Sequence, residues 1–150
     1  MKLQVKKLRE DAILPTRGSA KSSGLDLYAV EDVTIYAGCT ALVRTGVAFG
    51  IPEGYEIQIR PRSGLSLTTK LIVKNSPGSV DQDYVGECMV IMHSLVDHEL
   101  FGLGNAPSII KRGDRIAQAV LCPVMIPELE EVEELGVTER GNNGLGSTGK

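Results

Sequence analysis

A Ser-Pro-Gly turn, two carboxylates, a tyrosine and a closing glycine stand together in Asn75-Ser76-Pro77-Gly78-Ser79-Val80-Asp81-Gln82-Asp83-Tyr84-Val85-Gly86. If residues 80–84 are extended, the Asp81 and Asp83 side chains lie on one face and Tyr84 lies on the other. Two carboxylates on one face repel each other, so one can act as a base while the other accepts hydrogen bonds. The simpler interpretation is a polar β-hairpin with an Asx turn, because Asp and Asn are ordinary turn residues.

The segments around this run are short and rich in strand-forming residues. Residues 55–60 alternate between apolar and polar side chains, which predicts a strand with one apolar face. Residues 88–95 and 116–124 are apolar runs typical of buried strands. Further strands are expected at 3–6, 25–30, 33–36, 71–73 and 41–49, the last interrupted by Gly46 at a bend or bulge. Many short strands separated by Gly, Pro and Asp predict an all-β sandwich or barrel.

Three segments depart from this pattern. Residues 65–70 can form one helical turn. Residues 129–135 have an apolar side chain at every third position, so they can form a short acidic helix. Residues 97–108 predict an extended hairpin loop between two strands.

Composition limits the possible functions. The 150 residues predict one domain, 1–150, with its own core. A net charge of −3 argues against a large nucleic-acid interface, and no apolar run is long enough to span a membrane. The N-terminal residues lack the apolar region of a secretory signal. Cys39, Cys88 and Cys122 are isolated and predict reduced thiols, which favours a cytoplasmic protein. From the charge and the lack of a long apolar run, we expect neither nucleic-acid nor membrane partners.

Several polar side chains could bind phosphate. Arg62, Ser63 and Gly64 follow a predicted strand and offer a guanidinium fork, a hydroxyl and backbone amides, although such a group more often forms a salt-bridged loop. Gln118 offers an amide, and Arg140 can bind an anion through two hydrogen bonds. We expect Asp114 and Arg115, which are adjacent in the sequence, to form a structural ion pair. We assign no function to His93 and His98. The glycine-rich end of the chain is the last candidate for phosphate binding.

That glycine-rich end, residues 144–150, fits the G-x-x-x-x-G-K pattern of a P-loop. A P-loop also needs a strand before it and a Ser or Thr and a helix after the lysine, and this sequence provides none of them. The backbone amides and hydroxyls of such a segment can still surround a phosphate. We therefore expect a tail, residues 137–150, that is mobile when empty and ordered over a bound ligand.

Five segments together resemble the sequence motifs of the trimeric dUTP pyrophosphatases (dUTPases), in that family's order. They are residues 22–29, 60–65, 75–86, 111–118 and 140–149. The resemblance covers nearly the whole chain. It implies an all-β, jelly-roll-like subunit of a homotrimer that hydrolyses dUTP to dUMP and pyrophosphate in nucleotide metabolism, with active sites at subunit interfaces. It also implies that residues 129–135 are extended rather than helical.

The resemblance assigns a role to each candidate residue. Asp81 matches the general base, and Asp26 matches a residue that helps to hold a hydrated Mg²⁺. Asn75, the backbone of Ser79, Val80 and Asp81, and Met89 match the uracil-reading hairpin, and Tyr84 matches the residue that packs under the deoxyribose. The residues that match phosphate contacts are Arg62, Ser63, Gly64, Gln118, Arg140, Gly146, Ser147 and Thr148.

Two features depart from the family pattern. Leu145 stands where most members have an aromatic residue that covers the uracil, and residues 97–108 are longer than expected. Two other functions stay open. One is a deaminase acting on dCTP, a relative that shares the fold and would need a glutamate base beside the cytosine. The other is a non-enzymatic role in which residues 97–108 contact a partner protein.

Overall fold

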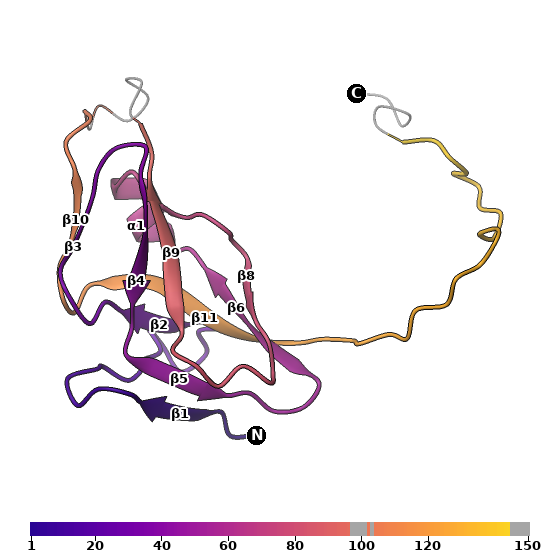
Figure 1. Ribbon diagram of the computed structural model, residues 1–150, viewed down its shortest axis with the longest axis horizontal. Coiled ribbons are helices and arrows are strands. Elements are labelled where there is room, and N and C mark those ends of the chain that lie inside the picture. The colour runs from indigo at the N-terminus through magenta and orange to yellow at the C-terminus, as the bar shows by residue number, and fades with distance from the viewer. Residues whose placement is uncertain (97–101, 103, 145–150) are drawn as a thin grey trace.

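The regular secondary structure of the protein consists almost entirely of short antiparallel strands. The computed structural model describes residues 1–96, 102 and 104–144 (Figure 1). Its strands are β1 (Gln4–Lys7), β2 (Leu25–Tyr28), β3 (Val33–Ile35), β4 (Thr40–Arg44), β5 (Val47–Gly50), β6 (Tyr55–Arg60), β7 (Leu71–Val73), β8 (Gly78–Val80), β9 (Met89–Ser94), β10 (Ser108–Ile110) and β11 (Arg115–Pro123). This architecture confirms the all-β prediction.

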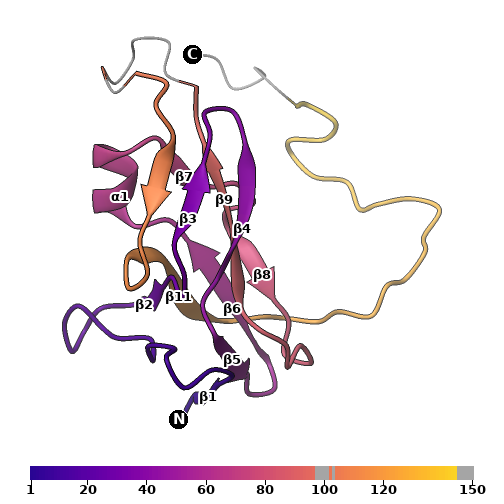
Figure 2. The same ribbon diagram turned by 60° about the vertical axis from the view of Figure 1, so that its left-hand side comes forward.

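Four sheets enclose one apolar core. The largest has the strand order β2-β11-β6-β8, and the next has the order β4-β9-β7. The pairs β1-β5 and β10-β3 complete the body (Figure 2). Side chains from several of these sheets meet in the core, where Leu27, Ile57, Val90, Met92 and Ile116 are almost completely buried.

The hydrophobic pattern of each strand accounts for its place. In β6, Ile57 and Ile59 are buried while the other four residues are partly exposed, which confirms the predicted alternation. In the described residues, α1 (Ser63–Thr68) is the only helix, as the pattern at 65–70 suggested. Its six residues are far too few to cross a membrane.

Residues 41–49 form two strands rather than one. The break lies at Gly46, whose φ of 68° falls in the left-handed region that favours glycine. A Cβ there would also lie 2.7 Å from the Cβ of Ala12. This confirms the expected interruption and shows its cause, which is close packing as well as backbone conformation.

The connection from β9 to β10 is not a hairpin, because β9 pairs with β4 and β7 whereas β10 pairs with β3. The prediction of an extended hairpin loop is therefore wrong in its topology. The buried Lys70 ammonium donates to the carbonyls of Gly104 and Ala106, at 2.6 and 2.8 Å. A hydrogen bond of 2.9 Å joins the hydroxyls of Ser94 and Ser108. These contacts fix the end of the connection to the body.

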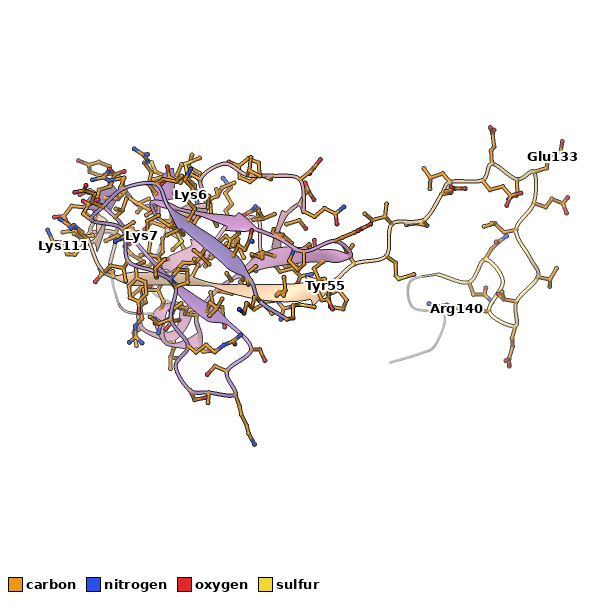
Figure 3. All side chains as sticks on the ribbon, turned by 90° about the horizontal axis from the view of Figure 1, so that it is seen from below. Lys6, Lys7, Tyr55, Lys111, Glu133 and Arg140 are labelled. Atoms are coloured by element: carbon orange, nitrogen blue, oxygen red, sulfur yellow. The ribbon has the colours of Figure 1, made fainter. Side chains whose placement is uncertain are left out.

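After Pro123 the chain leaves the body as a long arm (Figures 1 and 3). Residues 129–135 are not helical, as the family resemblance implied. Met125, Leu129 and Leu135 are between 87% and 97% exposed, so no other described part of the chain covers them. Residues 137–144 belong to this arm, and residues 145–150 lie outside the described residues. The mobility expected for 137–150 stays a prediction.

Candidate active site

The segment after β8 is a turn and not an extended strand. β8 ends at Val80, and the Tyr84 amide donates to the Asp81 carbonyl at 3.1 Å. The Gln82 side chain accepts a hydrogen bond of 3.0 Å from the Gly54 amide, which ties the turn to the start of β6. Residues 80–84 are therefore not extended, and the side-chain arrangement that depended on that condition does not form. Asp81 and Asp83 do not share a strand face, and the turn presents both side chains to solvent.

The turn forms one wall of a pocket with a volume of about 270 Å³. Six residues predicted to bind substrate line it, namely Asn75, Ser79, Val80, Asp81, Tyr84 and Met89. The chain places them there through β8, β9 and the turns on either side of β8. Asp81 also borders a second hollow of about 350 Å³, together with Tyr55, Glu56 and Asp83. The exposed Asp81 side chain thus lies at the edge of the pocket, between the two hollows.

Two glycines allow polar side chains to pack tightly at this pocket. A Cβ on Gly78 would lie 2.7 Å from Nδ2 of Asn75. A Cβ on Gly86 would lie 2.6 Å from Oη of Tyr84 and 2.7 Å from its Cζ. The sequence suggested Gly78 as a turn residue, but the structure shows that the absence of a side chain at Gly78 makes room for Asn75. The same explanation applies to Gly86 and the Tyr84 ring.

Sequence reasoning missed Glu87, which lines the pocket beside Tyr84. Its Oε2 accepts hydrogen bonds from Nη2 and Nε of Arg44, at 2.7 and 3.0 Å, and its Oε1 accepts one of 2.8 Å from the Gly46 amide. Burial acts to raise the pKa of this carboxyl, but the hydrogen bonds from Arg44 and Gly46 outweigh it, so the pKa lies below its usual range. Both carboxylate oxygens are already engaged by the protein.

Four apolar or weakly polar residues, Ile59 of β6 among them, complete the lining. Leu42 of β4 lies opposite Ile91 of β9, and both face the pocket. Cys88 is buried, and burial raises the pKa of its thiol to about 12. The thiol is therefore protonated at neutral pH and is not a nucleophile. The alternation of residues 89–94 was the signal that could have placed Ile91 on the same face as Met89.

A second group of predicted residues lies around Asp26 on β2. The Asp26 carboxylate accepts hydrogen bonds from Nε of Arg62 at 2.7 Å and from Nη1 of Arg115 at 3.3 Å. The expected pairing of Arg115 with Asp114 is therefore wrong. Asp114 instead accepts a hydrogen bond of 2.8 Å from the Lys111 amide and closes the turn before β11.

Gln118 and α1 adjoin this group. Gln118 donates a hydrogen bond of 2.9 Å from Nε2 to the Pro61 carbonyl. A Cβ on Gly24 would lie 2.0 Å from Oε1 of Gln118, so a third glycine makes room for a predicted site residue. Ser63 and Gly64 are the exposed first residues of α1. These residues form a cluster near one end of β6 that is rich in hydrogen-bond donors for phosphate.

The turn that carries Asp81 and the group around Asp26 lie at opposite ends of β6. Arg60 at one end pairs with Gln118, whereas Ile57 near the other end pairs with Val80, the last residue before Asp81. Glu56, which borders the same hollow as Asp81, is four residues from Arg60 along β6. At roughly 3.3 Å per strand residue, the two are about 13 Å apart. None of the four phosphate candidates Arg62, Ser63, Gly64 and Gln118 lines the pocket that contains Asp81. Within one chain, the base-binding and phosphate-binding candidates are therefore separate.

The remaining candidates lie outside both groups. Arg140 is on the arm, where its Nε donates to the Asn143 carbonyl at 3.0 Å (Figure 3). Nδ1 of His93 lies 3.0 Å from the Thr40 hydroxyl on a sheet surface. The predicted contacts Leu145, Gly146, Ser147 and Thr148, together with His98, lie outside the described residues.

The donor set near Asp26 suits a hydrated ion rather than a bare one. Within the described residues, no group of three or more His, Cys, Asp or Glu side chains could enclose a metal. A carboxylate offers about four lone-pair positions, and two guanidinium hydrogen bonds leave room on Asp26 for the O–H of a metal-bound water. Mg²⁺ commonly keeps several waters and takes its other ligands from substrate phosphates. The residues present fit such an ion.

Comparison with known proteins shows the family of the chain. The dUTPase family model matches residues 10–149. The deoxyuridine 5'-triphosphate nucleotidohydrolase of Hydrogenobaculum sp. is 51% identical over 150 residues, which cover 99% of each chain. The protein of the same description from Nautilia profundicola is 48% identical over the full length of both chains.

Solved structures show the same fold. The dUTPase of Staphylococcus bacteriophage 80alpha with dUPNHPP superimposes with a TM-score of 0.88 at 32% identity and covers 99% of both chains. A mutant dUTPase from phage phi11 of S. aureus, whose structure describes the coordination of a structural Mg(II) ion, gives 0.80 at 29% identity and covers 91% of this chain and 100% of its own. On its sequence, its fold and the match over residues 10–149, the chain belongs to the dUTPase family.

Proposed function

We propose that this protein hydrolyses dUTP to dUMP and pyrophosphate in a Mg²⁺-dependent reaction. The observation that carries the proposal is the pocket in which the amide of Asn75, the backbone of β8, the Tyr84 ring and the Asp81 carboxylate come together. Its volume of about 270 Å³ suits a nucleoside rather than a whole nucleotide, so the phosphates extend beyond it.

Asp81 is the general base. Its carboxylate lies at the edge of the pocket, where it can hold one water between the nucleoside and the adjoining hollow. The water oxygen attacks the α-phosphorus as its proton passes to Asp81, and the bond from that phosphorus to the bridging oxygen of the β-phosphate breaks. Pyrophosphate leaves in line with the attack. Positioning and charge stabilisation supply most of the rate enhancement.

The pocket selects the base and the sugar. Asn75 and the backbone of Ser79 to Asp81 offer an amide and peptide groups that can reproduce a pairing edge for uracil. The wall that Leu42 and Ile91 contribute leaves little room for a 5-methyl group. The Tyr84 ring packs against the deoxyribose. A ribose 2′-OH would be buried there without a partner, which costs about 1–3 kcal/mol.

The phosphates are bound by the cluster around Asp26. Arg62 and Arg115 supply charge, Ser63 and Gly64 supply a hydroxyl and amides, and the Gln118 amide is a further donor. Asp26 would hold a hydrated Mg²⁺. When bound, Mg²⁺ neutralises phosphate charge and fixes one triphosphate geometry. Arg140 and the residues after it approach the phosphates from the arm.

A homotrimer with shared sites accounts for the separation of the two clusters. The pocket of one subunit supplies the base, sugar and Asp81 contacts, and the Asp26 cluster of a neighbour supplies phosphate contacts. The arm, whose apolar residues are exposed in the single chain, crosses to another subunit. Shared sites make activity dependent on assembly, so a monomeric variant would be inactive.

The alternative of a dCTP deaminase is disfavoured by Glu87. It is the glutamate that lines the pocket, and a deaminase would need such a carboxylate free to transfer protons. Arg44 and the Gly46 amide occupy its two oxygens. A role confined to partner binding does not require the pocket next to Asp81.

One assay separates these functions. The purified protein is incubated with dUTP or dCTP, with Mg²⁺ or with EDTA, and pyrophosphate and ammonia are measured. Pyrophosphate from dUTP only, reduced by EDTA, is the expected result. Ammonia from dCTP would establish the deaminase instead, and neither product would leave the binding role. Light scattering on the same sample tests for a mass three times that of the chain.

A further inference from the structure

The hydroxyl of Tyr84 has its hydrogen-bond partner within its own turn. It donates to the carbonyl of Glu87 at 3.0 Å, and the ring lies against the bare Cα of Gly86. The Tyr84 side chain is 44% exposed, so packing alone does not fix its orientation. The direction of the ring therefore depends on where the Glu87 carbonyl lies.

The position of Glu87 is in turn fixed from another part of the sheet. Its carboxylate is bound by the Arg44 guanidinium and the Gly46 amide, in the link between β4 and β5. The next residue, Cys88, is held by the same link, because its amide donates to the Val47 carbonyl at 2.8 Å and its carbonyl accepts from the Thr45 hydroxyl. Residues 44–47 thus hold residues 87–88 through both side-chain and backbone hydrogen bonds.

The conformation of the link itself is also restricted. Gly46 has a φ of 68°, and its amide points at Oε1 of Glu87. Charge is part of this contact, because Arg44 approaches one carboxylate oxygen with two nitrogens. A neutral side chain of the same shape keeps the acceptor for Gly46 but presents an amide to the guanidinium.

We propose that Glu87 is a positioning residue, which through the Tyr84 hydroxyl sets the preference for a deoxyribose over a ribose nucleotide. This inference rests on the proposed function. The carboxylate itself does not touch the nucleotide in this account. It fixes the carbonyl that orients the Tyr84 ring, and the ring excludes the 2′-OH.

The test uses Glu87→Gln, which removes the charge, and Arg44→Ala, which removes the partner. The Arg44 side chain is 45% exposed, so its loss leaves no large cavity. The measured quantity is kcat/KM for dUTP divided by kcat/KM for UTP. We expect this ratio to fall about tenfold in both variants, the loss expected for one hydrogen bond to a charged group. Most of the fall should come from a rise in kcat/KM for UTP, with kcat/KM for dUTP changing less.

A double variant shows whether the effect passes through Tyr84. Tyr84→Phe removes the hydroxyl, so Glu87→Gln should change the ratio little when Tyr84→Phe is already present. Asp32→Ala, which breaks the exposed Lys111–Asp32 ion pair, is the control and should leave the ratio unchanged. Equal losses for dUTP and UTP in Glu87→Gln, or full additivity of the two substitutions, would overturn the proposal and leave Glu87 a structural role.

A binding measurement keeps the two proposals distinguishable. If the wild-type protein does not hydrolyse dUTP, the proposed function fails. The same variants are then compared for binding of dUMP and UMP by isothermal titration calorimetry. A smaller difference between the two affinities in Glu87→Gln than in wild type still supports the role of Glu87, and an unchanged difference rejects it.

Discussion

The side chain of Asn75 lies over Gly78, so closely that a Cβ on the glycine would be 2.7 Å from Nδ2 and 3.2 Å from Cγ of Asn75. The residue predicted to read the base is thus oriented by the absence of a side chain three positions later. The atoms that would clash belong to the end of a short side chain, which can rotate away. A methyl group at Gly78 would therefore displace Asn75 more than it would unfold the protein.

Gly78→Ala should weaken dUTP binding about tenfold, because the displaced Asn75 amide, a neutral group, no longer forms its hydrogen bond to the base. The melting temperature should change little. Gly18→Ala is the matched control, because a Cβ there meets only the Ser22 hydroxyl, at an ordinary 3.6 Å. Calorimetric titration with a non-hydrolysable dUTP analogue measures the first effect. Unchanged affinity in Gly78→Ala would show that Asn75 does not contact the base.

Asp81→Asn retains the size of the side chain and removes the base. We expect kcat to fall on the order of 10²-fold or more, with substrate binding largely retained. Asp83→Asn is the natural control, because Asp83 lies in the same turn but does not line the base pocket. Hydrolysis of dUTP at a near wild-type rate by Asp81→Asn would exclude Asp81 as the base.

Removal of residues 140–150 should leave a folded trimer that binds nucleotide weakly and turns over slowly. The reason is that Arg140 lies on the arm outside the core, and the glycine-rich residues that follow it match phosphate contacts. Size-exclusion chromatography with light scattering and a turnover assay check this together. Dissociation of the trimer, or full activity, would contradict it.

The Glu87 carboxylate should make stability depend on pH. Its pKa is lowered in the folded protein, so its contribution is present above the pKa of the unfolded chain and is lost as the pH falls through the folded value. The difference in free energy of unfolding between wild type and Glu87→Gln should thus be constant near neutral pH and shrink in acid. Urea denaturation at several pH values measures it, and a difference that grows toward low pH would contradict the sign.

Leu145→Phe should tighten dUTP binding by up to about tenfold, because base–aromatic stacking exceeds the apolar contact of a leucine by about 1 kcal/mol. The melting temperature of the empty protein should not change. Titration of both proteins with a non-hydrolysable dUTP analogue measures the gain. Equal or weaker binding by the Phe variant would mean that residue 145 does not cover the base.

Local patterns were sufficient to predict most strands. The alternation in residues 55–60 and the apolar run at 116–124 specify burial one residue at a time, so β6 and β11 could be placed from sequence. The turn at 81–84 could not be placed this way, because it depends on the bond from Gly54 to Gln82. Those residues are 28 positions apart, and no local pattern encodes the contact.

The candidate site shows the same limit. Residues 75–89 contain most of the predicted pocket contacts, and the motif order was enough to select them. Glu87 was missed because its significance comes from Arg44 and Gly46, more than 40 positions earlier. The three glycines beside Asn75, Tyr84 and Gln118 were visible in the sequence, but the side chains that need their space were not.

The exposed apolar residues of the arm have a consequence for how the protein responds to dilution. Met125 and Leu129 are 91% and 97% exposed in the single chain, so in the proposed trimer a second subunit would bury them. The fraction of residues buried between molecules depends on protein concentration through mass action, whereas burial within one fold does not. Activity per milligram should therefore be constant at high protein concentration and fall steeply below the dissociation constant of the assembly. Leu129→Ser should move that fall to higher concentration without changing the plateau.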